Sequence, residues 1–170
     1  MQVDTFQFSF QVYESAADLD PQDAMLLLKA QEVSALAYAP YSHFYVGAAA
    51  KLQNGIIVTG TNQENASYPV GICAERVLLA SASSVSPNTP VESIAISYRS
   101  DTISSDHPIA PCGICRQSLL EYEIRMKQPI KLILGGMEGK VYVIKEACML
   151  LPFCFTQDDL YSSSSRSVSA

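Results

Sequence analysis

Apolar and polar residues alternate in the first patterned stretch of the chain, residues 6–13. The apolar members are Phe6, Phe8, Phe10 and Val12, and polar residues stand between them. A period of two predicts a half-buried β-strand over residues 6–13, since successive side chains of a strand point to opposite faces. This segment stands apart from the other patterned segments, so we expect an edge strand.

Longer segments predict helices. The first begins at Asp20-Pro21, where Asp20 can cap the helix and Pro21 suits the first helical position. We expect it to end near Tyr38, because Pro40 disfavours helical backbone in the residue before it. The other predicted helices are residues 73–84, residues 112–126, and a last turn or two at 145–151.

Short apolar runs bounded by turn residues predict the remaining strands. Asn54-Gly55 is a strong hairpin signal, since both residues tolerate positive φ in a type I′ turn. These further strands are predicted at 46–52, 56–60, 91–98, 130–134 and 141–144. The hairpin implies antiparallel pairing, and the strand–helix–strand crossovers imply parallel pairing.

We therefore expect an α/β fold, a three-layer α-β-α sandwich with a mixed five-stranded sheet. Residues 1–160 are predicted to form a single domain, in which residues 1–19 are an N-terminal extension carrying the edge strand. Residues 161–170 are rich in serine and nearly free of apolar side chains, so we expect this tail to be disordered.

Composition narrows the class of protein. The net charge of −6 argues against nucleic acid as a partner, because phosphate binding needs clustered Lys and Arg. No apolar run approaches the ~20 residues of a membrane span. The N-terminus lacks a basic segment followed by an apolar block, so we expect no signal peptide and a cytoplasmic protein with reduced thiols.

Three of the five cysteines form a pattern typical of a metal site. Cys112 and Cys115 are three residues apart, which places both sulfurs on one face of a first helical turn. Cys73 and Glu75 can approach the same ion only if Cys73 stands at the very start of its helix. Free N–H groups and the helix dipole favour thiolates there. Three protein ligands leave a position for water, as catalytic zinc sites do.

Three thiolates carry a formal charge of −3 against the +2 of zinc, so a nearby cation would help. Arg76 adjoins the site and is the candidate for this compensation, whereas for Arg116 a surface salt bridge is the preferred interpretation. Cys148 and Cys154 lack spacing partners and are expected to be buried small hydrophobes.

At this point the motifs resemble a known family, the small, homotetrameric, zinc-dependent cytidine deaminases, over residues 39–155. The family signature joins a Cys-x-Glu to a later Pro-Cys-x-x-Cys. The matching segments here are Tyr41-Ser42-His43-Phe44, residues 46–49, Asn62-Gln63-Glu64-Asn65, Tyr68-Pro69, Cys73-Ala74-Glu75-Arg76, residues 111–117, and Leu150-Leu151-Pro152 followed by Phe155.

The resemblance implies Zn²⁺ on Cys73, Cys112 and Cys115, with Glu75 moving protons between water, the pyrimidine ring and the leaving amine. It also implies that Asn62 and Glu64 bind the ribose hydroxyls, and that Arg76 bonds the zinc thiolates. The remaining substrate contacts that it implies are Phe44, Asn65, Tyr68, Ala74 and, in a neighbouring subunit of a homotetramer, Phe155. The implied activity is hydrolysis of cytidine and deoxycytidine to uridine and deoxyuridine with release of ammonia, as in pyrimidine salvage.

An uncharged nucleoside needs no basic cradle, in keeping with an acidic chain. Deamination of a related cytosine nucleoside such as blasticidin S stays open as an alternative. So does a non-catalytic zinc-binding module, which needs a fourth protein ligand. A thiol oxidoreductase would instead form a disulfide between Cys112 and Cys115.

Overall fold

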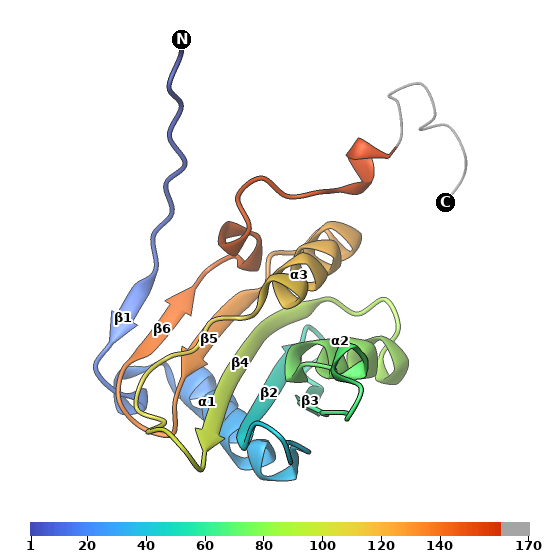
Figure 1. Cartoon of the computed structure of the whole chain (residues 1–170). Coiled ribbons are helices and arrows are strands. Elements are labelled where there is room, and N and C mark those ends of the chain that lie inside the picture. Colours follow the sequence, from blue (N-terminus) through green and yellow to red (C-terminus); the bar gives the residue numbers. More distant parts are fainter. Residues whose placement is uncertain (161–170) are drawn as a thin grey trace.

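Six strands form one mixed sheet in the order β1-β6-β5-β4-β2-β3 (Figure 1). The computed structural model describes residues 1–160, so the tail predicted to be disordered, residues 161–170, lies outside the described residues. The strands are β1 (Gln11–Tyr13), β2 (Phe44–Leu52), β3 (Ile57–Thr61), β4 (Val91–Ser100), β5 (Lys131–Gly135) and β6 (Val141–Ile144). Within residues 1–160, β4 and β5 are the one parallel pair of neighbours.

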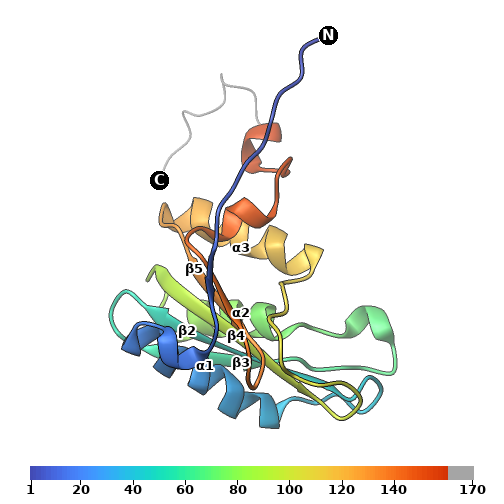
Figure 2. The same ribbon diagram turned by 90° about the vertical axis from the view of Figure 1, so that its left-hand side faces the viewer.

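Helices cover both faces of this sheet, which confirms the predicted three-layer α/β fold. They are α1 (Pro21–Val33), α2 (Ala74–Val85) and α3 (Gly113–Met126), with short 3₁₀ turns that include Ala147–Leu150. Figure 2 shows α1 on one side of the sheet and α3 on the other. The buried apolar residues divide accordingly into one cluster under α2 and α3 and a second cluster under α1.

The sheet has six strands rather than the five we predicted, because β1 pairs antiparallel with β6. The predicted strand over residues 6–13 is confirmed at 11–13 and is wrong over 6–10. Strand β6 ends at Ile144, one residue past the partner of Gln11, so the chain before β1 has little neighbouring strand to pair with. Residues 1–10 instead run out beyond the sheet (Figure 1).

The predicted hairpin joins β2 and β3, but its turn is not type I′. A type I′ turn needs positive φ at both central residues, and Gly55 alone of the pair has it, at 85°. Gly55 N donates to Leu52 O over 2.8 Å, so residues 52–55 form a β-turn with Gln53 and Asn54 at its centre, and Gly55 ends it with positive φ.

Strands β3 and β4 are consecutive in the chain but are not neighbours in the sheet. Strand β2 lies between them and pairs antiparallel with both. The connection from β3 to β4 therefore contains α2, and the connection from β4 to β5 contains α3. Both helices lie on the same face of the sheet, and each follows a loop that brings the chain back to the same end of it (Figure 1).

Helix α2 lies very close to β3. A Cβ atom on Gly60 would come within 2.5 Å of both Ala74 O and Leu78 N, so only glycine allows this approach. The first turn of α2 is thereby held directly against the sheet, and the residues that begin α2 have a fixed depth in the fold.

Candidate metal centre

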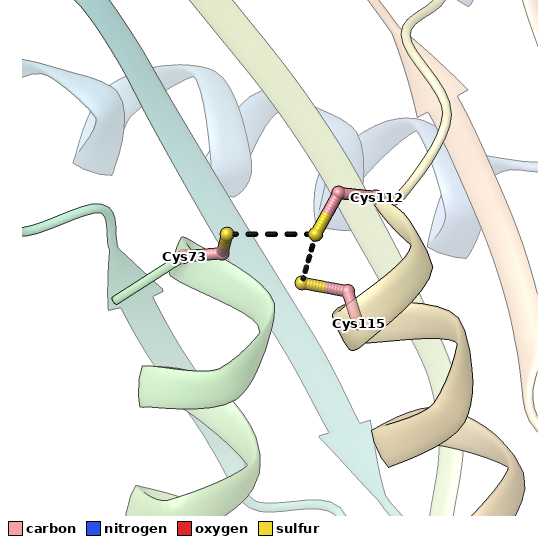
Figure 3. A group of neighbouring side chains, drawn as sticks. All are labelled: Cys73, Cys112 and Cys115. Carbon is pink, nitrogen blue, oxygen red and sulfur yellow. Dashed lines mark hydrogen bonds between the residues drawn. The ribbon is translucent and has the colours of Figure 1, made fainter. Parts of the chain in front are cut away.

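Both helices that carry the predicted ligands begin at a cysteine. Cys73 is the N-cap of α2, Cys112 is the N-cap of α3, and Cys115 lies in the first turn of α3. The backbone of both N-cap residues is extended, which turns each side chain toward the neighbouring helix (Figure 3). The first N–H groups of a helix have no intrahelical partner and favour negative charge, so both positions suit a thiolate.

The three sulfurs lie at the spacing that zinc requires. Cys73 Sγ is 3.7 Å from Cys112 Sγ, which is 3.5 Å from Cys115 Sγ, and all three lie within 4.8 Å of one another. Tetrahedral Zn–S bonds of about 2.3 Å would place neighbouring sulfurs about 3.8 Å apart. The donor set therefore fits a zinc ion with little rearrangement.

Within residues 1–160, no fourth His, Cys, Asp or Glu side chain joins this group of three. Structural zinc sites are usually closed by four protein ligands, and catalytic sites keep a position for water or substrate. Cys112 is exposed, so solvent can reach the cluster. The ligand count is that of a catalytic site.

The pKa values of Cys73 and Cys115 are shifted in opposite directions. Hydrogen bonding from Cys115 lowers the pKa of Cys73 to about 6, against the opposing effects of burial and of Glu75; Cys112 and the positive charge of Arg76 also lower it. The hydrogen bond to Cys73 and burial raise the pKa of Cys115. These opposite shifts favour a thiolate at Cys73 and a thiol at Cys115 when no cation is present, and a bound cation would favour the ionised form of each ligand.

Glu75, the second residue of α2, is buried beside the thiols, with 5 % of its surface exposed. Burial raises the pKa of the Glu75 carboxyl above its ordinary value, although hydrogen bonds from its own backbone and from Cys115 oppose the shift. Because its pKa is raised, this carboxyl keeps its proton to a higher pH than a free glutamate does, as is common for acid–base groups. The structure therefore places a buried carboxyl with a raised pKa next to the three thiols.

Arg116 binds two carbonyl oxygens instead of the carboxylate that we expected. Its Nε donates to Pro111 O over 2.8 Å, and its Nη1 donates to Leu150 O over 3.0 Å. The first bond fixes the residue that precedes Cys112. The second ties the segment after β6 to the start of α3.

Asn62 uses its amide to organise the start of β2. Its Oδ1 accepts from Val46 N over 2.7 Å, and its Nδ2 donates to Phe44 O over 2.9 Å. The Phe44 ring in turn stacks on Tyr98, with 4.8 Å between ring centroids and 17° between the planes. Tyr98 is not among the site residues that we predicted from the sequence. Its alternation with Ile94 and Ile96 along β4 was the signal that placed it on the α2 and α3 face.

A cavity of 360 Å³ lies between the loop before β2 and the loop after β3, and several predicted substrate contacts line it. It is lined by Tyr41, Ser42, Glu64, Asn65, Tyr68 and Gly71. Glu64 Oε2 accepts from Tyr41 N over 2.9 Å, which joins the loop after β3 to the loop before β2. Ala74 lies at the first position of α2 and is fully buried, so its contact with a substrate stays a prediction.

Phe155 is not among the residues that line this cavity. It lies on the segment after Ala147–Leu150, and 58 % of its surface is exposed. Gln117 Nε2 donates to Phe155 O over 2.9 Å, so α3 anchors this segment to the body of the protein. The role of Phe155 in a neighbouring subunit stays a prediction. Cys148 is partly buried and Cys154 is exposed, so the burial expected for Cys154 is wrong.

Comparisons with known proteins agree with this geometry. Residues 20–128 match the family model described as the cytidine and deoxycytidylate deaminase zinc-binding region. A cytidine deaminase of Halalkalibacterium halodurans is 38 % identical over 136 residues, which cover 80 % of this chain and 96 % of that protein. A probable cytidine deaminase of Dictyostelium discoideum is 34 % identical, with 81 % and 86 % covered.

Solved structures give the same result. The crystal structure of a cytidine deaminase from Burkholderia pseudomallei superposes with a TM-score of 0.67 at 39 % identity, covering 77 % of this chain and 97 % of that one. The cytidine deaminase of Mycobacterium tuberculosis gives a TM-score of 0.61 at 30 % identity, covering 82 % and 99 %.

Proposed function

The chain belongs to the family of cytidine and deoxycytidylate deaminases, and from this premise we propose that it hydrolyses cytidine and deoxycytidine to uridine and deoxyuridine with release of ammonia. One observation carries the proposal. Three sulfurs spaced 3.5 and 3.7 Å apart stand at two helix N-termini beside a buried carboxyl whose pKa is raised. That set combines a three-ligand metal site with a proton carrier.

Cys73, Cys112 and Cys115 would hold the zinc ion. When bound, zinc supplies a Lewis acid that makes water nucleophilic near neutral pH. Arg76 lowers the pKa of Cys73 through its charge, which is the direction that compensation of the thiolates requires. Arg116 keeps the chain before Cys112 in place through Pro111 O.

Glu75 would perform the acid–base steps of the reaction. Its carboxylate accepts a proton from the attacking water, delivers it to the pyrimidine ring, and later helps to protonate the departing amine. Burial raises the pKa of Glu75, so the protonated form that these transfers require is accessible. The same burial keeps bulk water from exchanging protons with the carboxyl during turnover.

The substrate would enter through the cavity that Glu64, Asn65 and Tyr68 line. None of the six residues that line it is Lys or Arg, so the cavity suits the neutral ribose of a nucleoside better than a 5′-phosphate. Glu64 would accept hydrogen bonds from ribose hydroxyls, the backbone of Ala74 would face the base, and Phe44 would pack near the ring. Asn62 would act together with Phe44, whose carbonyl it binds.

A homotetramer would complete this site. Phe155 is exposed on a segment that α3 anchors through Gln117, and this exposure supports the proposal because it leaves the ring available to a neighbouring molecule. No helix within residues 1–160 has the length and apolar character to cross a bilayer. We further propose that residues 1–160 form one catalytic domain that works in the cytoplasm, where thiol ligands stay reduced.

Metal analysis together with an ammonia-release assay tests the proposal. Purified protein should contain about one zinc per chain and should deaminate cytidine and deoxycytidine, with little turnover of deoxycytidine 5′-monophosphate or blasticidin S. Glu75→Gln is the matched variant, and it should keep zinc while losing about 10²–10⁴ in rate. Turnover of blasticidin S alone, or wild-type turnover in Glu75→Gln, would overturn the assignment.

A further inference from the structure

Helices α2 and α3 each bring ligands to the metal centre, and a tyrosine links them farther along. The hydroxyl of Tyr122, on α3, donates to Leu79 O of α2 over 2.5 Å and also contacts the Ser83 hydroxyl. The guanidinium of Arg125 lies over the Tyr122 ring, 4.1 Å from its centroid, and Arg125 Nη2 donates to Ser83 Oγ over 3.0 Å.

This contact sits at matching depths along the two helices. Leu79 follows Cys73 by six residues, and Tyr122 follows Cys115 by seven residues. We call the contact of Tyr122 with Leu79 and Ser83 the clamp. At 1.5 Å of rise per residue, the clamp lies about 10 Å along each helix from the metal ligands. The ligands at the N-termini (Figure 3) and the clamp farther down are thus two separate points at which the helices meet.

Apolar packing also joins the two helices, since they contact each other and share one buried cluster that includes Leu78, Leu79 and Leu119. Each helix has further support of its own, because α2 rests on β3 and β2 and α3 contacts the 3₁₀ turn Ala147–Leu150. A carbonyl oxygen in a helix has a second lone pair after its intrahelical bond, so Leu79 O can accept from Tyr122 without breaking α2. A hydrogen bond between partly buried groups has directional preference that apolar packing lacks.

We propose that Tyr122 is a positioning residue that fixes the spacing of α2 and α3, and thereby holds Cys73 within bonding distance of a metal on Cys112 and Cys115. The inference rests on the proposed zinc site. Tyr122 touches neither metal nor substrate, and it acts through the two helices. Loss of its hydroxyl would let the helices shift, and a shift of a few tenths of an ångström is large against a metal–sulfur bond of about 2.3 Å.

Tyr122→Phe tests this directly, because it removes the hydroxyl and keeps the ring under Arg125. Zinc transfer from the folded protein to a chromophoric chelator should become about fivefold to tenfold faster, the range for one partly buried hydrogen bond. The Co²⁺-substituted variant should show a changed ligand-field spectrum. Ser83→Ala leaves the bond to Leu79 O in place and should have a smaller effect.

Glu123→Gln is the matched control. Glu123 adjoins Tyr122 on α3 but bonds backbone groups of Ile130, Ala147 and Cys148, away from α2. It should lower the unfolding midpoint without changing zinc release or the Co²⁺ spectrum. Equal acceleration in both variants, or unchanged release in Tyr122→Phe, would overturn the inference and leave the proposed function standing. A wild-type protein that binds no zinc would overturn both.

Discussion

Asn62 binds the backbone on both sides of Tyr45: its Nδ2 donates to Phe44 O over 2.9 Å, and its Oδ1 accepts from Val46 N over 2.7 Å. The family resemblance assigns Asn62 to the ribose, whereas these bonds make it a support for Phe44. Each oxygen and amide nitrogen can form a further bond, so the two roles are compatible.

Substitution of Asn62 can separate these roles. Asn62→Ala leaves two backbone groups without a partner, so the free energy of unfolding should fall by about 1–3 kcal/mol and KM should rise. The informative comparison is between cytidine and 3′-deoxycytidine. If Asn62 acts through Phe44, the variant raises KM by the same factor for both substrates. A penalty confined to cytidine would instead show that Asn62 acts by binding the ribose hydroxyl.

The stability of the protein at acidic pH should depend on the ionisation of Glu64, which binds the loop before β2. Partial burial raises the pKa of Glu64, but hydrogen bonds from Ser42 and from Tyr41 N, together with His43, outweigh it and hold the pKa below its ordinary 4.5. Folding thus favours the ionised form. Its contribution to stability is present above the ordinary pKa and is lost as the pH falls through the lowered one.

Glu64→Gln, which does not titrate, provides the comparison. Unfolding midpoints of the two proteins, measured in steps from pH about 6 to about 3, should differ most at the upper end and converge at the lower end. A constant difference across this range would contradict the ionised role of Glu64.

Gly60 should be intolerant of any side chain. In Gly60→Ala the new Cβ would meet Ala74 O and Leu78 N at 2.5 Å, so α2 must move away from β3. Overpacking of this kind costs about 1–3 kcal/mol of unfolding free energy. Because Cys73 begins α2, zinc content should fall as well. Chemical denaturation and metal analysis would measure the two effects.

Gly113→Ala is the control for Gly60→Ala. A Cβ on Gly113, at the start of α3, meets nothing within 4 Å. Alanine is also the better helix former, so this variant should be as stable as the wild type or slightly more stable. Similar losses in both variants would show that the close approach at Gly60 is not what makes it sensitive.

Glu123 joins three parts of the chain through buried backbone groups. Its Oε1 accepts from Ile130 N over 2.7 Å and from Ala147 N over 2.9 Å, and its Oε2 accepts from Cys148 N over 2.9 Å. A glutamine presents one acceptor oxygen and one donor, so Glu123→Gln should lose about 1–3 kcal/mol of stability. Urea titration of both variants would measure the loss. Glu121→Gln, exposed on the same helix, is the control and should leave the free energy of unfolding almost unchanged.

The thiol cluster was predictable because it depends on local geometry. Cys112 and Cys115 share one helical turn, and the pattern around Cys73 requires that it begin a helix, so the sequence already implied that the sulfurs point outward from two N-termini. Hydrophobic periodicity likewise predicted the main helices and strands and the parallel pairing across α3.

Contacts between distant segments could not be predicted in the same way. The hydroxyl of Tyr122 finds Leu79 O only after both helices lie on the sheet, and neither residue has a pattern that indicates the other. The stacking of Phe44 on Tyr98 depends on the register of β2 against β4. The end of β6 determines where β1 begins to pair, so the alternation over residues 6–13 overstated the strand.

The ligands Cys73 and Cys112 lie 39 positions apart in the sequence, with all of α2 and β4 between them. Closing a loop of that length costs entropy, and contacts between remote segments form late in folding. We therefore expect the ion to join a chain that is already nearly native. Added zinc should slow unfolding strongly while leaving the refolding rate almost unchanged, so that the metal prolongs the lifetime of the enzyme without guiding its assembly.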